Sequence, residues 1–261
     1  MRSKYMVGLL LLGVCLLPNW ASSPKTQGHY TSQRVDNLPS FHALSVKGNV
    51  EVDFMQLPTS AVHASGPQKI LDQSLVQVKD GVLEVAYPPG VLAKKTDVLK
   101  VMITGPSLRR VDVSDKAEVH VRGKLREQEM AITLTQQADF SADDVAVHTL
   151  HLHVENQAEA DINRLDAYQI LAESSGQAAI ELAGLALKAH FENHGSGEID
   201  AADLRVQTGH AVVNGRGNID ISAYESLTAT VFGKGRIKYR GSPVQMQRVG
   251  NLKHIIQDKD D

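Results

Sequence analysis

The sequence predicts an all-β fold, a β-helix-like solenoid with a repeat of about twenty residues. Three observations predict it. Small residues recur at nearly constant spacing from residue 108 onward, apolar and polar residues alternate after each of them, and the apolar positions recur once per repeat. A unit so short buries its apolar face only by stacking on the next unit, which lines the apolar positions into interior columns. A helical period does not produce this strict alternation.

Seven small residues anchor the repeat, at successive spacings of 21, 20, 20, 19, 20 and 18: Ala117, Ala138, Ala158, Ala178, Gly197, Gly217 and Gly235. The second and fourth residues after each anchor are apolar, for example Phe140 and Ala142. The residue between them is polar in all seven repeats, which is typical of a strand with one buried face.

Two further sets of apolar residues belong to each repeat. One lies eight and six residues before the anchor, as with Leu150 and Leu152. The other lies seven residues after it, and we expect all of its members inside the solenoid: Val145, Leu165, Leu185, Leu204 and Tyr224. Paired glycines such as Gly195 and Gly197 mark a corner, where positive φ or a close backbone approach favours glycine.

Residues 41–105 also alternate, but less regularly, and Asp80-Gly81 predicts a hairpin turn between two strands. No linker separates this part from the regular repeats at 108–243. We therefore expect a single β-solenoid domain over 41–250, preceded by a flexible segment at 24–40 and followed by a polar tail at 251–261.

Residues 1–23 have the pattern of a secretory signal peptide. Arg2 and Lys4 precede an apolar run over residues 6–17 that is too short to span a bilayer. Cleavage after Ala21 and cleavage after Ser23 are both compatible with the pattern. A third alternative is a lipoprotein acylated at Cys15, although Val14 departs from the usual lipobox. We expect an exported protein in the periplasm, the outer membrane or the extracellular space.

Composition excludes several classes of protein. The 42% of hydrophobic residues is ordinary for a globular protein, and a formal net charge of −3 is not that of a nucleic-acid-binding protein. No second apolar run of spanning length follows residue 23, so we expect no transmembrane span in the mature chain. The single cysteine excludes an internal disulfide.

Four motifs in a fixed order resemble a family of exported bacterial proteins, the putative auto-transporter adhesin head GIN domain. They are Phe41-x-x-Leu44-x-Val46-x-Gly48-x-Val50, Gly195-Ser196-Gly197-Glu198-Ile199, Gly215-Arg216-Gly217-Asn218-Ile219, and the run from Gly233 to Pro243. The likeness spans roughly residues 38 to 250, and departs from the family pattern in having alanine at the first four anchors. The resemblance implies a β-helix-like fold at the cell envelope or outside the cell, and the family has no catalytic residues that could be assigned to this chain.

His148, His151 and His153 form a cluster of closely spaced histidines, and closely spaced imidazoles can bind zinc. His151 and His153 alternate with apolar residues, which places them on the outer face of a strand. A further ligand would have to come from a neighbouring coil. We therefore expect no metal site there.

Acidic residues recur in two columns, one with Asp139, Glu159 and Glu198 and one with Asp161, Glu181, Asp200 and Asp220. Paired carboxylates perform glycosidic chemistry. Here they form the polar half of an alternating pattern, with no singular position. Calcium-roll, nucleophile-elbow and nucleotide-loop motifs are not matched either. We therefore expect no catalytic, cofactor-binding or metal-binding residues.

The sequence favours a non-enzymatic envelope or surface interaction module of adhesive type, with an envelope glycan or an envelope protein as its partner and no nucleic acid. Stacked coils present long, regular faces suited to such ligands. Two alternatives stay open: a polysaccharide-active enzyme on a β-helix scaffold, and a structural envelope lipoprotein.

Overall fold

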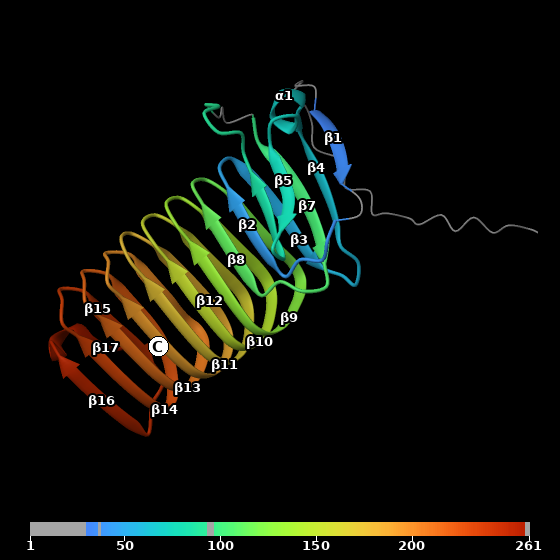
Figure 1. The fold of residues 1–261 in the computed structure, drawn as a ribbon. Helices are drawn as coiled ribbons and strands as arrows, with labels where there is room; N and C mark the ends of the chain where they lie inside the picture. Colours follow the sequence, from blue (N-terminus) through green and yellow to red (C-terminus); the bar gives the residue numbers. More distant parts are fainter. Residues whose placement is uncertain (1–29, 36–37, 93–96, 259–261) are drawn as a thin grey trace, which may run out of the picture.

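The computed structural model describes residues 30–35, 38–92 and 97–258, and it confirms the predicted fold class. Stacked coils form a β-solenoid that runs from the shorter strands near the N-terminus to the C-terminal strands (Figure 1). Its strands join in one 17-stranded sheet. The predicted signal peptide at 1–23 and Cys15 lie outside the described residues.

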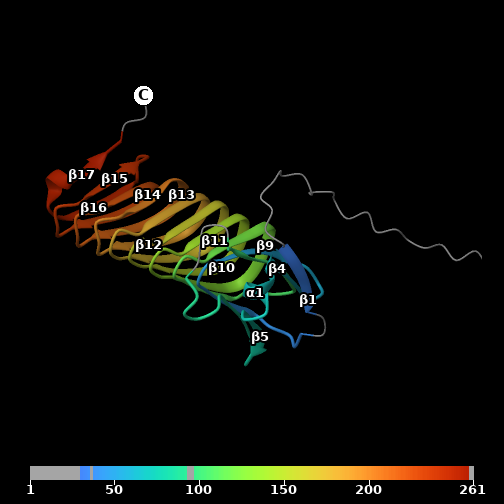
Figure 2. The same cartoon turned by 90° about the horizontal axis from the view of Figure 1, so that it is seen from above.

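Six long strands make the regular coils: β9 (Glu118–Leu134), β10 (Asp139–Val154), β11 (Glu159–Ser174), β12 (Ala179–Asn193), β13 (Glu198–Val213) and β14 (Asn218–Val231). Each pairs with the next in parallel, with the predicted anchors in register; Phe140, for instance, lies opposite Val119 and Ala160. The view from above shows these coils stacked along one axis (Figure 2).

In the coils formed by β10, β11 and β13, the in-out alternation slips twice. In β10, Phe140 and Ala142 are buried, Asp143 and Asp144 both face outward, and alternation resumes with Val145. A second pair of outward residues follows Val147. Two successive outward residues mark a bend, because a strand that stayed straight would bury one of them. Each of these three coils therefore has three short faces joined by two bends, and a turn leads to the next coil.

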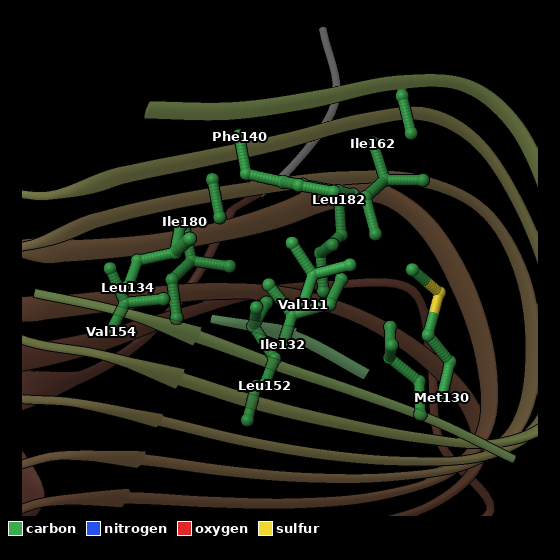
Figure 3. Packing of buried hydrophobic residues seen from close by; sticks show 14 of the residues in the cluster. Val111, Met130, Ile132, Leu134, Phe140, Leu152, Val154, Ile162, Ile180 and Leu182 are labelled. Carbon is green, nitrogen blue, oxygen red and sulfur yellow. The ribbon is translucent and has the colours of Figure 1, made fainter. Parts of the chain in front are cut away.

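The interior is a continuous apolar column. Phe54, Phe140 and Phe191 are among its largest fully buried side chains. Figure 3 shows buried side chains of several coils, Ile132, Leu152 and Ile180 among them, packed inside the ribbon. Burying a large aliphatic side chain stabilises a fold by about 1.5 to 3 kcal/mol. With its only cysteine in the predicted signal peptide, the solenoid has this packing and its strand ladders to stabilise it.

The N-terminal part joins the same sheet. It contains β2 (Ala43–Lys47), β3 (Val50–Gln56), β4 (Ala61–Pro67), the single helical turn α1 (Gln68–Leu71), β5 (Leu75–Lys79), β6 (Val82–Ala86), β7 (Leu99–Gly105) and β8 (Arg110–Ser114). Parallel pairing of β2 with β6 and β8, and of β3 with β7 and β9, forms the first coils. The turn between β5 and β6 is Asp80-Gly81, as predicted; both residues have positive φ, which matches a tight hairpin.

Both ends of the solenoid extend beyond the expected limits. Residues 30–35, within the segment 24–40 that we expected to be flexible, form β1 (Tyr30–Val35), which pairs antiparallel with β4. At the other end, β15 (Arg236–Arg240) and β16 (Gln245–Gly250) are followed by a 3-10 turn (Leu252–His254) and β17 (Ile255–Gln257). Residues 252–257 are therefore part of the last coil and not a polar tail, because Ile255 pairs with Ile237 and is buried against the end of the core.

Two kinds of corner explain why the anchors change from alanine to glycine. At the early corners the residue two before the anchor has positive φ, as at Gln136 and Asn156, and the alanine anchor fits. At the later corners the chain approaches the preceding coil closely. A Cβ at Gly197 would lie 1.9 Å from the carbonyl oxygen of Ala178. Close backbone approach, rather than positive φ, therefore requires glycine at this anchor.

The expectation for the column seven residues after the anchor is wrong at two of five places. Val145, Leu165 and Leu204 are buried, but Leu185 and Tyr224 are exposed. Both belong to shortened repeats, of 19 and 18 residues. In β12, Gly184 takes the interior place opposite Leu165, so Leu185 moves to the outside; in β14, Ala223 is buried and Tyr224 is turned outward. A one-residue slip reverses the side on which a strand residue lies.

Candidate functional site

The three outward faces of the coils differ in chemistry. The acidic face carries Glu118, Asp139, Glu159, Asp161, Glu181, Asp200 and Asp220. The tyrosine face lies between the two bends and carries Asp166, Tyr168, Leu185, Leu187, Arg205 and Tyr224. The histidine face precedes the turn to the next coil and carries His153, Glu155, Glu173, His190, Glu192, His194 and His210.

The tyrosine face contains a shallow hollow of about 450 Å³. Four apolar or aromatic side chains around it are unusually exposed for their type: Tyr168 at 40%, Leu185 at 57%, Leu187 at 40% and Tyr224 at 42%. Exposed apolar residues gathered on one face of a soluble domain indicate an interaction surface, whereas single ones need no explanation. Two of these four are the residues that the shortened repeats turn outward.

Stacked rings and cations hold this face in place. The His148 ring lies parallel to the Tyr168 ring, with centroids 4.5 Å apart. Lys188 lies 5.5 Å from the centroid of Tyr168, and the Arg205 guanidinium lies 4.9 Å from that of Tyr224. Such cation–π contacts contribute about 0.5 to 1 kcal/mol at exposed sites and limit the motion of the rings.

The histidine face is a chain of alternating imidazoles and carboxylates across four coils. Nε2 of His153 is 2.8 Å from Glu155, and its Nδ1 is 3.3 Å from Oε2 of Glu173. On the next coil, Nε2 of His190 is 2.6 Å from Oε1 of Glu192. Nδ1 of His190 is also 3.1 Å from Nδ1 of His210, so the hydrogen between them belongs to one of the two rings.

His194 lies where the two carboxylates of this face converge. Its Nε2 is 3.4 Å from Oε1 of Glu173 and 3.1 Å from Oε2 of Glu192. Nδ2 of Asn214 lies 3.2 Å from Nδ1 of the same ring. The neighbouring Asn193 is fully buried, and its side chain bonds the turn that follows His194. The imidazole of His194 is therefore oriented by contacts at both nitrogens, and hydrogen bonds of Asn193 stabilise the turn beside it.

Two pKa shifts follow from these contacts. The hydrogen bond from His190 lowers the pKa of Glu192 below its usual value, with a further contribution from His194. Burial lowers the pKa of His210, and the neighbouring His190 lowers it further. At neutral pH, Glu192 is therefore a carboxylate and His210 a neutral imidazole.

The structure places the three candidate histidines of the sequence analysis, His148, His151 and His153, in three different surroundings. His148 stacks on Tyr168, His151 is exposed on its strand, and His153 joins the carboxylates of the histidine face. The cluster that does form was missed in the sequence. Its signal was the alternation His190-x-Glu192-x-His194, which predicts all three on one side of an extended segment, together with Glu173 one coil earlier.

The acidic columns align as their spacing predicts, with Asp139 opposite both Glu118 and Glu159. These three carboxylates line a hollow of about 390 Å³. Burial raises the pKa of Asp139, as do the charges of Glu159 and Asp161; burial, Glu51 and Asp139 raise that of Glu118. Burial and Asp200 likewise raise the pKa of Asp220. The carboxylates stand side by side on one face and do not oppose each other across a groove.

Known proteins share this fold. Two solved structures of putative adhesins superpose well: one from Parabacteroides merdae ATCC 43184 (TM-score 0.79, 22% identity, 89% of this chain and 98% of that chain covered) and one from Parabacteroides distasonis ATCC 8503 (0.80, 24%, 89% and 98%). A putative lipid binding protein from the latter organism matches similarly (0.79, 16%, 89% and 98%). At these identities the likeness shows the fold alone. None of the curated proteins matches the sequence.

Within the described residues, no helix is long and apolar enough to cross a membrane. The model of one protein family matches residues 40–243, which is most of the chain and includes all three faces of the regular coils. The match agrees with the motifs at Phe41, Gly195, Gly215 and Gly233. The chain belongs to the family described as putative auto-transporter adhesin, head GIN domain.

Proposed function

We propose that this protein is an exported, non-enzymatic interaction module of the cell envelope or cell surface, and that it binds a glycan chain along its tyrosine face. The observation that carries the proposal is the exposure of Tyr168, Leu185, Leu187 and Tyr224 on one face of a regular solenoid. Membership of an adhesin family supports a binding role.

The chemistry of the face suits a carbohydrate. A sugar ring has an apolar face of C–H groups and an edge of hydroxyls. Tyr168 and Tyr224 offer flat apolar rings with a polar tip. Asp166, Lys188 and Arg205 beside them offer acceptors and donors for hydroxyls. The hollow is shallow and the coils repeat at about 4.8 Å, so an extended chain fits better than a small enclosed molecule.

The arrangement of the carboxylates supports a non-enzymatic role. Glycoside hydrolysis uses two carboxyl groups that flank the bond, one kept protonated and one ionised by different surroundings. On the acidic face, Asp139 and its neighbours lie in a row on adjacent coils, so they stand side by side and do not flank one bond from opposite sides. The raised pKa values of Glu118, Asp139 and Asp220 are the features that favour the polysaccharide-active enzyme as the second candidate.

A glycan array tests the proposal, with the purified protein and a Tyr168→Ala/Tyr224→Ala double variant. Removal of central aromatic contacts from an interface costs about 2 kcal/mol or more, or roughly 30-fold in affinity. Phe232→Ala is the matched control, because Phe232 is an aromatic residue with 67% exposure that does not line the hollow. We expect the double variant to lose binding and the control to retain it.

Three results would contradict the proposal. Glycan binding that both variants retain would place the site elsewhere. Binding to lipid vesicles or to an envelope protein, with none to glycans, would identify another class of ligand; one structural neighbour is described as a lipid binding protein, so vesicles belong in the panel. Polysaccharide cleavage that disappears in Asp139→Asn would favour the enzyme.

A further inference from the structure

On the histidine face, three side chains present ligand atoms to one point in space. Glu173, Glu192 and His194 each offer one such atom, and all three atoms lie within 4.8 Å of one another. Glu173 and Glu192 are register partners on β11 and β12, and His194 begins the turn after β12. They come from two coils, so the cluster exists only in the folded protein.

The distances match those of a coordination shell. Two atoms bound at about 2.0 to 2.1 Å to one tetrahedral zinc ion lie about 3.3 Å apart. Nε2 of His194 is 3.4 Å from Oε1 of Glu173 and 3.1 Å from Oε2 of Glu192. An ion would therefore need only small side-chain movements. Nε2 carries at most one hydrogen and can donate it to only one of the two carboxylates, whereas one cation satisfies both.

Neighbouring side chains already orient each ligand. The second oxygen of Glu173 lies 3.3 Å from Nδ1 of His153, and the second oxygen of Glu192 lies 2.6 Å from Nε2 of His190. The amide of Asn214 lies at Nδ1 of His194, and by rotating it presents either its nitrogen or its oxygen there. Hydrogen bonds of this kind around the ligands are typical of metal sites.

The donor set selects the class of ion. Two carboxylates and a neutral imidazole carry a charge of −2, which favours a divalent cation. Imidazole favours zinc and its first-row neighbours over magnesium and calcium. The three side chains are between one third and one half exposed, so an ion can reach them from solvent.

We propose that Glu173, Glu192 and His194 bind a zinc-class divalent ion, with His153 and His190 as positioning residues. Three protein ligands leave at least one coordination position for water or for a donor atom of a bound partner. The site lies five residues along the strand from Tyr168, about 16 Å, and is independent of the glycan site proposed above.

Calorimetric titration tests the proposal, using untagged protein freed of metal by chelation and then titrated with zinc chloride. We expect one ion per chain, no comparable binding of magnesium or calcium, and a cobalt(II) derivative with the intense visible absorption of a four-coordinate site. His194→Gln and Glu173→Gln should abolish binding. His190→Gln should weaken it by about 10- to 100-fold, as removal of a residue that orients a ligand does.

His151→Gln is the matched control, because His151 is an exposed histidine on the same coil face that is not among the three ligands. It should bind zinc as the unaltered protein does. Far-ultraviolet dichroism verifies that each variant keeps its β fold. Absence of zinc binding would overturn the proposal, as would binding that survives both His194→Gln and Glu173→Gln or that depends equally on His151.

Discussion

Replacement of the buried Asn193 by alanine tests how the turn beside the histidine face is held. Asn193 occupies an interior position where most coils carry an apolar residue, and it is fully buried. Its Nδ2 donates to the carbonyl oxygens of Gly197 (2.9 Å) and Asn218 (3.1 Å), and its Oδ1 accepts from the N–H of Gly195 (2.9 Å). One side chain thus joins three backbone groups of two successive coils.

The expected loss follows from these three bonds. Each contributes about 1 kcal/mol net, and a buried donor left without an acceptor costs about 1 to 3 kcal/mol. The Gly197 carbonyl keeps a bond from the Asn218 N–H at 3.1 Å, but the Gly195 N–H loses the acceptor that Asn193 provides. We therefore expect Asn193→Ala to lower the free energy of unfolding by about 2 to 4 kcal/mol.

The adjacent coil provides a matched control. Ser174 lies opposite Asn193 in register and is also buried, but its Oγ has no hydrogen-bond partner within the described part of the chain. Ser174→Ala removes an unsatisfied polar group, so it should be neutral or stabilise the fold by up to about 1 kcal/mol. Urea denaturation followed by far-ultraviolet dichroism compares the midpoints of the two variants.

Equal shifts of the midpoint in the two variants would refute the reasoning, because burial would then matter and the bonds would not. A large destabilisation by Ser174→Ala would refute it as well, since the hydroxyl would then have a partner that the structure does not show. Denaturant slopes that match those of the unaltered protein are needed to attribute the shifts to stability.

Three further predictions concern the faces and the corners. Burial and nearby carboxylates raise the pKa of Asp139, so its ionisation destabilises the fold as pH rises through that pKa. Because solvent screens the charges at this half-buried position, Asp139→Asn should raise stability by only about 0.5 kcal/mol at pH 7 and leave it unchanged at pH 3, measured by urea denaturation. Leu204→Ser should cost several kcal/mol in the same assay and Leu185→Ser almost nothing; equal costs would mean that the outward turn of Leu185 is wrong. Gly197→Ala should prevent or severely weaken folding, because the added methyl would collide with the preceding coil. Gly123→Ala has open space around the added methyl, so it should lower stability by only about 1 to 2 kcal/mol because of its positive φ. Dichroism and thermal melting would compare the two variants.

Much of the fold was determined by the sequence alone, because a repeating strand with one buried face has few ways to bury it. The spacing of the anchors predicted the coils, and the position of Ile199 two residues after Gly197 predicted its burial. The turn at Asp80-Gly81 was predictable because its backbone preference is local. The alignment of Asp139 with Glu159 followed from the same period of twenty residues.

The candidate sites depended on tertiary structure. Leu185 and Tyr224 fit the apolar pattern, yet a deletion of one or two residues at a bend turns them outward, and a pattern of residue types does not reveal where a strand absorbs such a deletion. Ile255 looked like part of a polar tail until pairing with β15 buried it.

The same holds for the histidine face. In the sequence, His148, His151 and His153 were the candidate metal ligands because they are close along the chain. Alternate side chains of one strand, however, spread along the strand and cannot surround an ion by themselves. The stacking of β11 on β12 places Glu173 beside its register partner Glu192, because parallel strands in register hold equivalent residues about 4.8 Å apart. Glu173 thereby also comes close to His194, 21 positions further along the sequence. The sequence thus determined the repeat and which residues lie inside it, whereas only the register between coils decided which outward side chains meet.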